Sequence, residues 1–160
     1  MSLAHTLQEY LEWEEVNYDI IPHPYTQSSL ETARITHVPA QLLAKCVVLG
    51  DGYGYIMAIV PADCSVDIDY VSHALQRDFA LASESELVDL FYDCVPGSVP
   101  PLCEAYGFDS IVDRQIWNAA DVYFEGGDHE ALIHIEGITF RELMSEAALG
   151  DISLASAYTH

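Results

Sequence analysis

Lys45 is the only lysine in the sequence, which has 160 residues and contains 26 Asp and Glu but only five Lys and Arg. It lies in the apolar run 42–49, which we expect to form a buried strand. Lysine seldom lies in such a run unless its ammonium is paired or takes part in function. A fixed cation there could hold a phosphate or polarise a carbonyl group. The alternative is a lysine at a strand edge, whose stem packs on apolar surface while its ammonium reaches water.

The segment Gly97-Ser98-Val99-Pro100-Pro101 is the second candidate. Its glycine lets a ligand approach the backbone closely, and its prolines fix the shape of the loop, so the loop amides could face a ligand with little entropy to lose. The alternative interpretation is a rigid surface loop. Ser98 is not a predicted nucleophile, because no G-x-S-x-G motif occurs and serine in such a loop commonly forms turns.

The histidines at 129 and 134 do not form a zinc motif. A zincin needs H-E-x-x-H on a helix, and here one extra residue separates His129 from His134. The local sequence is typical of a strand, on which residues an odd number apart point to opposite faces. The phosphate-binding motifs G-x-x-x-x-G-K-[ST] and G-x-G-x-x-G are also absent. We therefore predict neither a metal nor another cofactor.

Cys46 follows Lys45 directly, and a neighbouring ammonium could lower the pKa of its thiol and make it a nucleophile. Neighbours in a strand face opposite ways, however, so a thiol in the core is the favoured interpretation. The cysteines form no C-x-x-C pair, and we expect free thiols in a reducing cytoplasm. They are Cys46, Cys64, Cys94 and Cys103.

The formal charge of −21 argues against broad binding to DNA or other polyanions, but it does not exclude a small site for one or two phosphates. No stretch approaches the ~20 apolar residues that cross a bilayer. The first residues lack the basic and apolar regions of a secretory signal, so we expect a cytoplasmic protein without a membrane partner. The length of 160 residues fits a single domain over 1–160.

These candidates must be positioned by helices and strands that alternate along the chain. Capping boxes and apolar periodicity predict helices over about 2–15, 28–37, 83–91 and 139–150, and another from 67. Strands are expected over about 16–21, 43–49, 55–60, 108–112, 120–125 and 130–136, and a loop over 93–106. Hairpin signals at 51–54 and 126–128 argue against an all-parallel sheet. We predict an α+β domain with a mixed, curved sheet surrounded by helices, and a loosely attached tail over 151–160.

Taken in order, several segments resemble the YbaK and prolyl-tRNA-synthetase-associated (INS-like) editing domain family. They are IPHPYT at 21–26, ETA at 31–33, HVP at 37–39, LAKCVV at 43–48, AIVPAD at 58–63, the G-x-x-x-P loop at 97–101 and FEGGDH at 124–129. The resemblance covers about residues 16–147.

The resemblance implies a trans-acting deacylase that hydrolyses the ester of a mischarged tRNA, such as alanyl- or cysteinyl-tRNA(Pro), without a metal. It also implies a mixed sheet curved into a partial barrel. Lys45 would be the essential lysine, which holds the terminal adenosine and its phosphate. The loop from Gly97 to Pro101 would shape the aminoacyl pocket and offer backbone donors to the carbonyl.

Further candidate residues follow from the same resemblance. His129 falls near a position where some members place a residue that tunes specificity, and Cys46 falls where several have threonine or asparagine. His23 and Tyr25, in the first matching segment, are further candidates for substrate binding. Water would be activated largely by the substrate's own ribose hydroxyl and by backbone groups. The implied partners are the acceptor end of an aminoacylated tRNA and an aminoacyl-tRNA synthetase.

The strong negative charge leaves three possibilities open, because affinity for nucleic acid depends mainly on phosphate contacts. The chain could hold only the acceptor end, a partner such as a synthetase could supply the remaining contacts, or the chain no longer acts on tRNA. The alternative function is a non-catalytic module that senses an amino-acid-like or nucleotide-like ligand in the same cleft. The sequence does not specify which aminoacyl group is removed.

Overall fold

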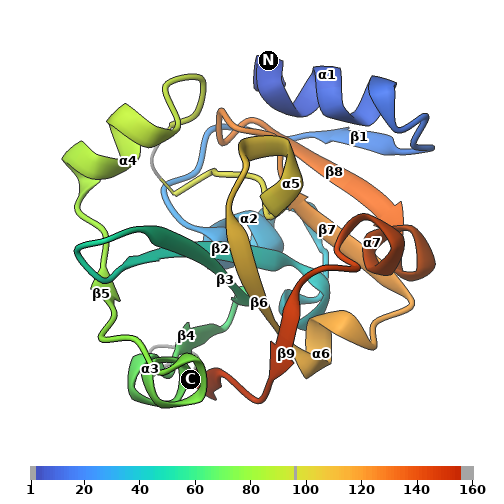
Figure 1. Ribbon diagram of the computed structural model, residues 1–160. Coiled ribbons are helices and arrows are strands. Elements are labelled where there is room, and N and C mark those ends of the chain that lie inside the picture. Colours follow the sequence, from blue (N-terminus) through green and yellow to red (C-terminus); the bar gives the residue numbers. More distant parts are fainter. Residues whose placement is uncertain (1–2, 96, 156–160) are drawn as a thin grey trace.

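The larger of the two main sheets has five strands of mixed direction. The structure is a computed structural model that describes residues 3–95 and 97–155 (Figure 1). The strand order is β5 (Ala80–Leu81), β2 (Ala44–Gly50), β3 (Tyr55–Pro61), β6 (Asp109–Asp113) and β9 (Ala148–Gly150). Strand β2 runs antiparallel to both β5 and β3, whereas β3, β6 and β9 run parallel to one another. This arrangement confirms the predicted α+β class with a mixed sheet.

The second sheet is antiparallel and has three strands. Its order is β1 (Asp19–Pro22), β8 (Ala131–Glu136) and β7 (Asp121–Glu125). An isolated parallel bridge between Leu43 and Tyr123 connects it to the larger sheet. A separate pair joins β4 (Cys64–Val66) to β10 (Ser153–Ala155). Among the described residues the strands do not close into a barrel, so the sheets form a partial one.

Helices lie around these sheets, as Figure 1 shows for α1 above β1 and β8, α4 beside β5, and α3 close to β4. Three of them begin where predicted, after the capping residues Ser28, Asp67 and Ser83. Each capping side chain accepts a hydrogen bond from the backbone N–H of the residue three positions later. The helices are α1 (His5–Trp13), α2 (Ser29–Thr36), the 3-10 helix η1 (Ala40–Leu42), α3 (Ile68–Leu75), α4 (Glu84–Leu90), α5 (Cys103–Tyr106), α6 (Arg114–Trp117) and α7 (Gly137–Leu143).

Strand β3 separates two parts of the hydrophobic core. Met57 and Ile59 pack in the cluster that includes α1, α7 and the smaller sheet, whereas Ile56, Ala58 and Val60 pack in the cluster beneath α3. Successive side chains of a strand point to opposite faces, so β3 is buried on both faces. This explains why its sequence is an unbroken apolar run rather than an alternating one.

The end of the chain differs from the prediction of one helix over 139–150. The helix begins at Gly137 and ends at Leu143, and Thr139 lies within it rather than capping it. A Cβ at Gly137 would lie 1.9 Å from the carbonyl oxygen of Ala119, so only glycine fits where the helix starts. Residues 148–150 instead form β9, which adds a parallel edge strand to β6. The predicted loop over 93–106 likewise contains the short helix α5.

The expectation of a loosely attached tail is wrong for residues 151–155. Ile152 is fully buried, and its N–H and that of Ser153 donate to Oδ1 of Asp113 at 3.0 and 3.1 Å. Asp113 itself is almost entirely buried, so its carboxylate is satisfied by these backbone groups. Residues 156–160 of the predicted tail lie outside the described residues.

His134 on β8 lies between two carboxylates of the smaller sheet. Its Nδ1 is 2.9 Å from Asp19 and its Nε2 is 2.8 Å from Asp121, while its ring stacks on Tyr123. Partial burial opposes protonation, but the hydrogen bonds to Asp19 and Asp121 outweigh it and raise the pKa of His134. The protonated ring can donate to both carboxylates at once.

We predict that His134→Gln is more destabilising at low pH than at high pH. Because the pKa of His134 is raised in the folded protein, its stabilisation is complete below the unfolded value of about 6.5 and is lost as the pH rises through the folded value. Urea unfolding should give a loss of about 1 kcal/mol at pH 5.5 and less at pH 8.5. The control His5→Gln, at an exposed pair with Glu9, should change stability by less than about 0.5 kcal/mol at either pH. An equal loss from His134→Gln at both pH values would contradict the ionic role.

Candidate functional site

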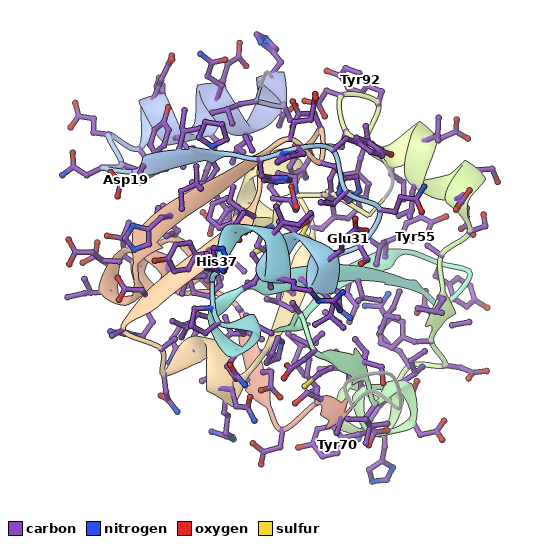
Figure 2. The ribbon with its side chains drawn as sticks, turned by 180° about the vertical axis from the view of Figure 1, so that it is seen from behind. Asp19, Glu31, His37, Tyr55, Tyr70 and Tyr92 are labelled. Atoms are coloured by element: carbon purple, nitrogen blue, oxygen red, sulfur yellow. The ribbon has the colours of Figure 1, made fainter. Side chains whose placement is uncertain are left out.

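A cavity of about 470 Å³ lies at the side of β2. Its walls come from residues 27–30 at the start of α2, 45–48 of β2, Ala62, Cys64 and Ser65 around β4, Leu81 and Ala82 at β5, Leu87 of α4, and Gly97 and Val99 of the proline-rich loop. Figure 2 shows that α2 runs from the end near Glu31 toward His37, with its first turn on the side of Tyr55 and α4. Five segments distant in sequence therefore meet around one hollow.

The cavity exists because β2 has a strand neighbour on only one side along most of its length. Residues 44–50 pair with β3, but β5 pairs only with Leu49 and Gly50. The carbonyl of Val48 accepts the N–H of Ala82 at 3.0 Å, so the polar backbone groups of Val48 point away from β3. By the alternation of an antiparallel ladder, the N–H and C=O of Cys46 point the same way. The open edge of β2 thus gives the cavity a wall with backbone donors and acceptors.

Lys45 provides the positive charge in this cavity. Its side chain is partly buried and its Nζ donates to the carbonyl oxygen of Cys64, which also lines the cavity. Burial lowers the pKa of Lys45, because the charged form loses hydration, and the negative charge of Asp63 partly opposes this. An ammonium has three N–H donors, so one bond to a carbonyl leaves two for a ligand.

Cys46 lines the cavity beside Lys45 but has the character of a core thiol. It packs against the main hydrophobic cluster, and burial raises the pKa of its thiol above the ordinary value. A thiol with a raised pKa stays protonated and is a poor nucleophile. The interpretation of Cys46 as a structural thiol is therefore favoured over nucleophilic catalysis.

The proline-rich loop presents Gly97 and Val99 to the cavity, while Ser98, Pro100 and Pro101 are buried and do not line it. The hydroxyl of Ser98 donates to the carbonyl of Val95 at 2.6 Å, so this serine fixes a turn. Gly97 has a φ of +89°, and a Cβ there would lie 3.3 Å from Nε2 of His129. Both the positive φ and the close histidine explain why this position is glycine.

The side chains of His129, His23 and Tyr25 do not line the cavity, and that of His129 lies next to Gly97. The ring of His129 is buried, and Tyr25 packs edge-on against it with ring centres 5.7 Å apart. His23 is also buried, and its backbone N–H donates to the carbonyl of Glu130 at 2.9 Å. These three residues form a second layer behind the loop.

Glu125, at the end of β7, connects this second layer to α2. Its buried carboxylate accepts the hydroxyl of Thr32 at 2.8 Å, and its two oxygens lie 3.4 Å from Nε2 of His23 and 3.9 Å from Nδ1 of His129. The hydroxyl of Thr26 also contacts that of Thr32. Buried polar groups of this kind hold a structure in place only when their hydrogen bonds are satisfied.

The imidazole of His23 is fixed by the backbone. Its Nδ1 is 2.8 Å from the carbonyl of Pro24, which can only accept, so Nδ1 carries a hydrogen. Its Nε2 faces Oε2 of Glu125 at 3.4 Å, and neither of these two buried atoms makes a hydrogen bond within the described part of the chain.

Comparison with known proteins agrees with this arrangement. A family model described as the aminoacyl-tRNA editing domain matches residues 23–143. The chain belongs to the aminoacyl-tRNA editing domain family. The family match includes the cavity, the proline-rich loop and the layer of His23, Glu125 and His129 behind it. No curated protein matches the sequence.

Solved structures share the fold of this editing domain. A proposed trans-editing enzyme for prolyl tRNA synthetase has a TM-score of 0.81 at 19% identity, over 94% of this chain and 96% of that one. The hypothetical protein APE2540 has a TM-score of 0.82 at 22% identity, over 94% and 100%. A proposed signal transduction protein from Marinobacter aquaeolei VT8 has a TM-score of 0.77 at 21% identity, over 98% of this chain but only 32% of that one.

Several residues around the site of this editing domain were not found by sequence reasoning. The capping box at Ser28 predicted α2 but not that its first turn lines the cavity. Glu125 lies in the segment 124–129 that carried the family resemblance, yet nothing local marks its side chain as buried. Among the described residues, no three His, Cys, Asp or Glu side chains are grouped so that they could hold a metal ion. Nor does the described part contain a helix long and apolar enough to cross a membrane.

We predict that Glu125→Ala lowers the free energy of unfolding by about 3 kcal/mol, because it removes the carboxylate that accepts from Thr32 and faces Nε2 of His23 in a buried site. Glu125→Gln should lose less than half as much, since an amide can accept from Thr32 and donate to a neutral His23. Urea unfolding at pH 7 gives both values. The exposed control Glu142→Ala should change stability by less than about 0.5 kcal/mol. Equal losses from the two Glu125 variants would show that an ionised carboxylate is required.

Proposed function

We propose that this editing domain is a trans-acting aminoacyl-tRNA deacylase that hydrolyses the ester of a mischarged tRNA, of the alanyl- or cysteinyl-tRNA(Pro) type, without a metal. The observation that carries the proposal is the Lys45 side chain in the wall of a cavity that Gly97 and Val99 also line. Membership of the editing domain family supports deacylation as the general activity. The structural likeness to the proposed trans-editing enzyme supports action on a tRNA that a separate synthetase has charged.

The chemical demand of this reaction is small. A water oxygen adds to the ester carbonyl, the bond to the ribose oxygen breaks, and that oxygen takes up a proton, which releases the amino acid and a free tRNA end. An aminoacyl ester is already activated, so orientation and a few kcal/mol of charge stabilisation are sufficient. The ribose hydroxyl next to the ester and backbone groups of the site would orient the water.

Each wall of the cavity has a role in this proposal. Lys45 would hold the phosphate of the terminal adenosine, with the first turn of α2 adding the partial positive charge of a helix N-terminus. The open edge of β2 at Cys46 would hydrogen-bond the aminoacyl part, and the backbone of Gly97 would approach its carbonyl. The side chains of Val48, Leu87 and Val99 are apolar and would exclude a charged amino acid. The volume of about 470 Å³ is within the range of small-molecule sites, roughly 300–1,000 Å³.

A sensor of small ligands is the second candidate function. The likeness to a proposed signal transduction protein, in which this fold makes up 32% of the chain, supports a use of the fold as a module. The same cation and backbone donors would then bind an amino acid or a nucleotide without turnover. Absence of hydrolysis of every ester by the wild type, with a rise in melting temperature on adding such a ligand, would favour this function.

We predict that Lys45→Ala lowers kcat/KM for the preferred aminoacyl-tRNA by at least ~100-fold, because the substrate phosphate loses the one cation among the described residues that line the cavity. Single-turnover deacylation of a panel of mischarged tRNAs measures this. The matched control is Arg114→Ala, which removes the same charge from an exposed pair with Asp151 and should leave the rate within about twofold. Unchanged melting temperatures would show that both variants fold. Full activity of the Lys45 variant would refute the assignment.

We predict that Gly97→Ala lowers kcat/KM at least ~10-fold, because the added Cβ would press on His129 and displace the loop. Gly107→Ala is the matched control, since its φ of +74° imposes similar backbone strain but no atom lies within 4 Å of the added Cβ. Each variant should lose about 1 kcal/mol of stability through this strain. If both glycine variants lost activity equally, strain rather than the loop's position would be responsible.

A further inference from the structure

Four of the five basic side chains are already committed within the protein. Arg77 binds Asp51 at 2.7 Å and Arg114 lies 3.4 Å from Asp151. Arg141 donates to the carbonyl oxygens of Trp117 and Ala119 at 2.9 and 3.3 Å. Lys45 is inside the cavity. The three arginines do not line the cavity, and Arg114, which is more than half exposed, has its charge paired with Asp151.

Arg34 is the fifth, and within the described residues it has no carboxylate partner. It is exposed on α2, four residues after Leu30, which lines the cavity. Residues four apart lie on the same face of a helix, roughly 6 Å from each other. Near the cavity mouth, Arg34 could therefore contact one further phosphate at most.

Acidic residues are close in sequence to several residues of the cavity wall. Glu31, Asp63 and Glu86 are each adjacent in sequence to a residue that lines the cavity. Asp63 is near enough for its charge to act on Lys45. With a formal charge of −21 over the whole chain, a polyanion that approaches the mouth meets repulsion beyond the first phosphate.

We propose that the protein recognises only the terminal aminoacyl-adenosine of its substrate, together with one phosphate, and that the body of the tRNA adds no affinity. This inference rests on the proposed deacylase function and specifies the substrate class of the same site. Discrimination then comes from the aminoacyl group in the cavity. The identity of the tRNA is not read by this chain.

The salt dependence of the reaction distinguishes this mode of recognition. Each phosphate contact to a single strand contributes a slope of about −0.7 to log K against log salt, so one contact changes affinity only about 3- to 4-fold between 50 and 300 mM salt. Six contacts would change it about 2,000-fold over the same interval by the same relation. Repulsion by the acidic mouth acts in the opposite direction, because salt screens it.

The test compares kcat/KM for alanyl- and cysteinyl-tRNA(Pro) with that for the matching 3′-aminoacyl esters of adenosine 5′-monophosphate, at 50 and 300 mM KCl. We expect the tRNA and the minimal ester to be hydrolysed within about 10-fold of each other, and the ratio of tRNA to ester to rise with salt. Arg34→Glu should change the rate on the tRNA by less than about 5-fold, and Lys45→Ala should abolish hydrolysis of both.

The possible outcomes separate this inference from the proposed function. A tRNA hydrolysed more than 100-fold faster than the minimal ester, with a steep fall in rate as salt rises, overturns the inference but leaves the deacylase standing. A large loss on the tRNA alone from Arg34→Glu also overturns it. If neither substrate is hydrolysed, the deacylase function fails and the inference with it.

Discussion

The site depends on a β-strand that is paired on only one side. Residues 44–48 of β2 bond to β3 but have no strand neighbour along their other edge within the described residues. An open strand edge normally invites aggregation and is covered by other elements. Here the first turn of α2, the loop at Gly97 and Leu87 of α4 cover the edge from a distance, which leaves the cavity between them and the strand. If β5 continued along β2 beyond its two residues, the cavity would be filled by backbone.

The proposed phosphate site depends on the electrostatics at this edge. Lys45 is only partly buried, so its ammonium keeps some hydration, and the carbonyl of Cys64 compensates part of the rest. A fully buried ammonium would shift toward its neutral form, and a fully exposed one would be screened by salt. The surrounding negative charge favours the charged form of Lys45 and repels extended polyanions. A strongly acidic protein can therefore retain a specific phosphate contact without a basic surface.

Local patterns in the sequence predicted the elements of the fold, but not the contacts between distant segments. The capping residues Ser28 and Ser83, and the hairpin at 51–54, depend on neighbours within a few residues, and they appear where expected. The helix predicted over 139–150 was wrong because its start is set by Ala119 and its end by the pairing of β9 with β6. Lys45 and the proline-rich loop stood out by composition alone. The role of Glu125 could not be predicted, since its burial depends on α2, β7 and the 23–26 segment meeting in space.

The position of the proline-rich loop also depends on α1, which lies outside the segment matched by the family model. The N–H of Ala4 donates to the carbonyl of Gly126 at 2.8 Å, and the N–H of Thr6 donates to Asp93 at 2.8 Å. Gly127 lies in the same turn, and its carbonyl accepts the N–H of Val95, just before the loop, at 2.8 Å. The start of α1 thus holds both the turn between β7 and β8 and the approach to Gly97. Because a displacement of about 1 Å in a positioning element can reduce a rate about 100-fold, α1 belongs to the functional unit even though it contributes no residue to the cavity.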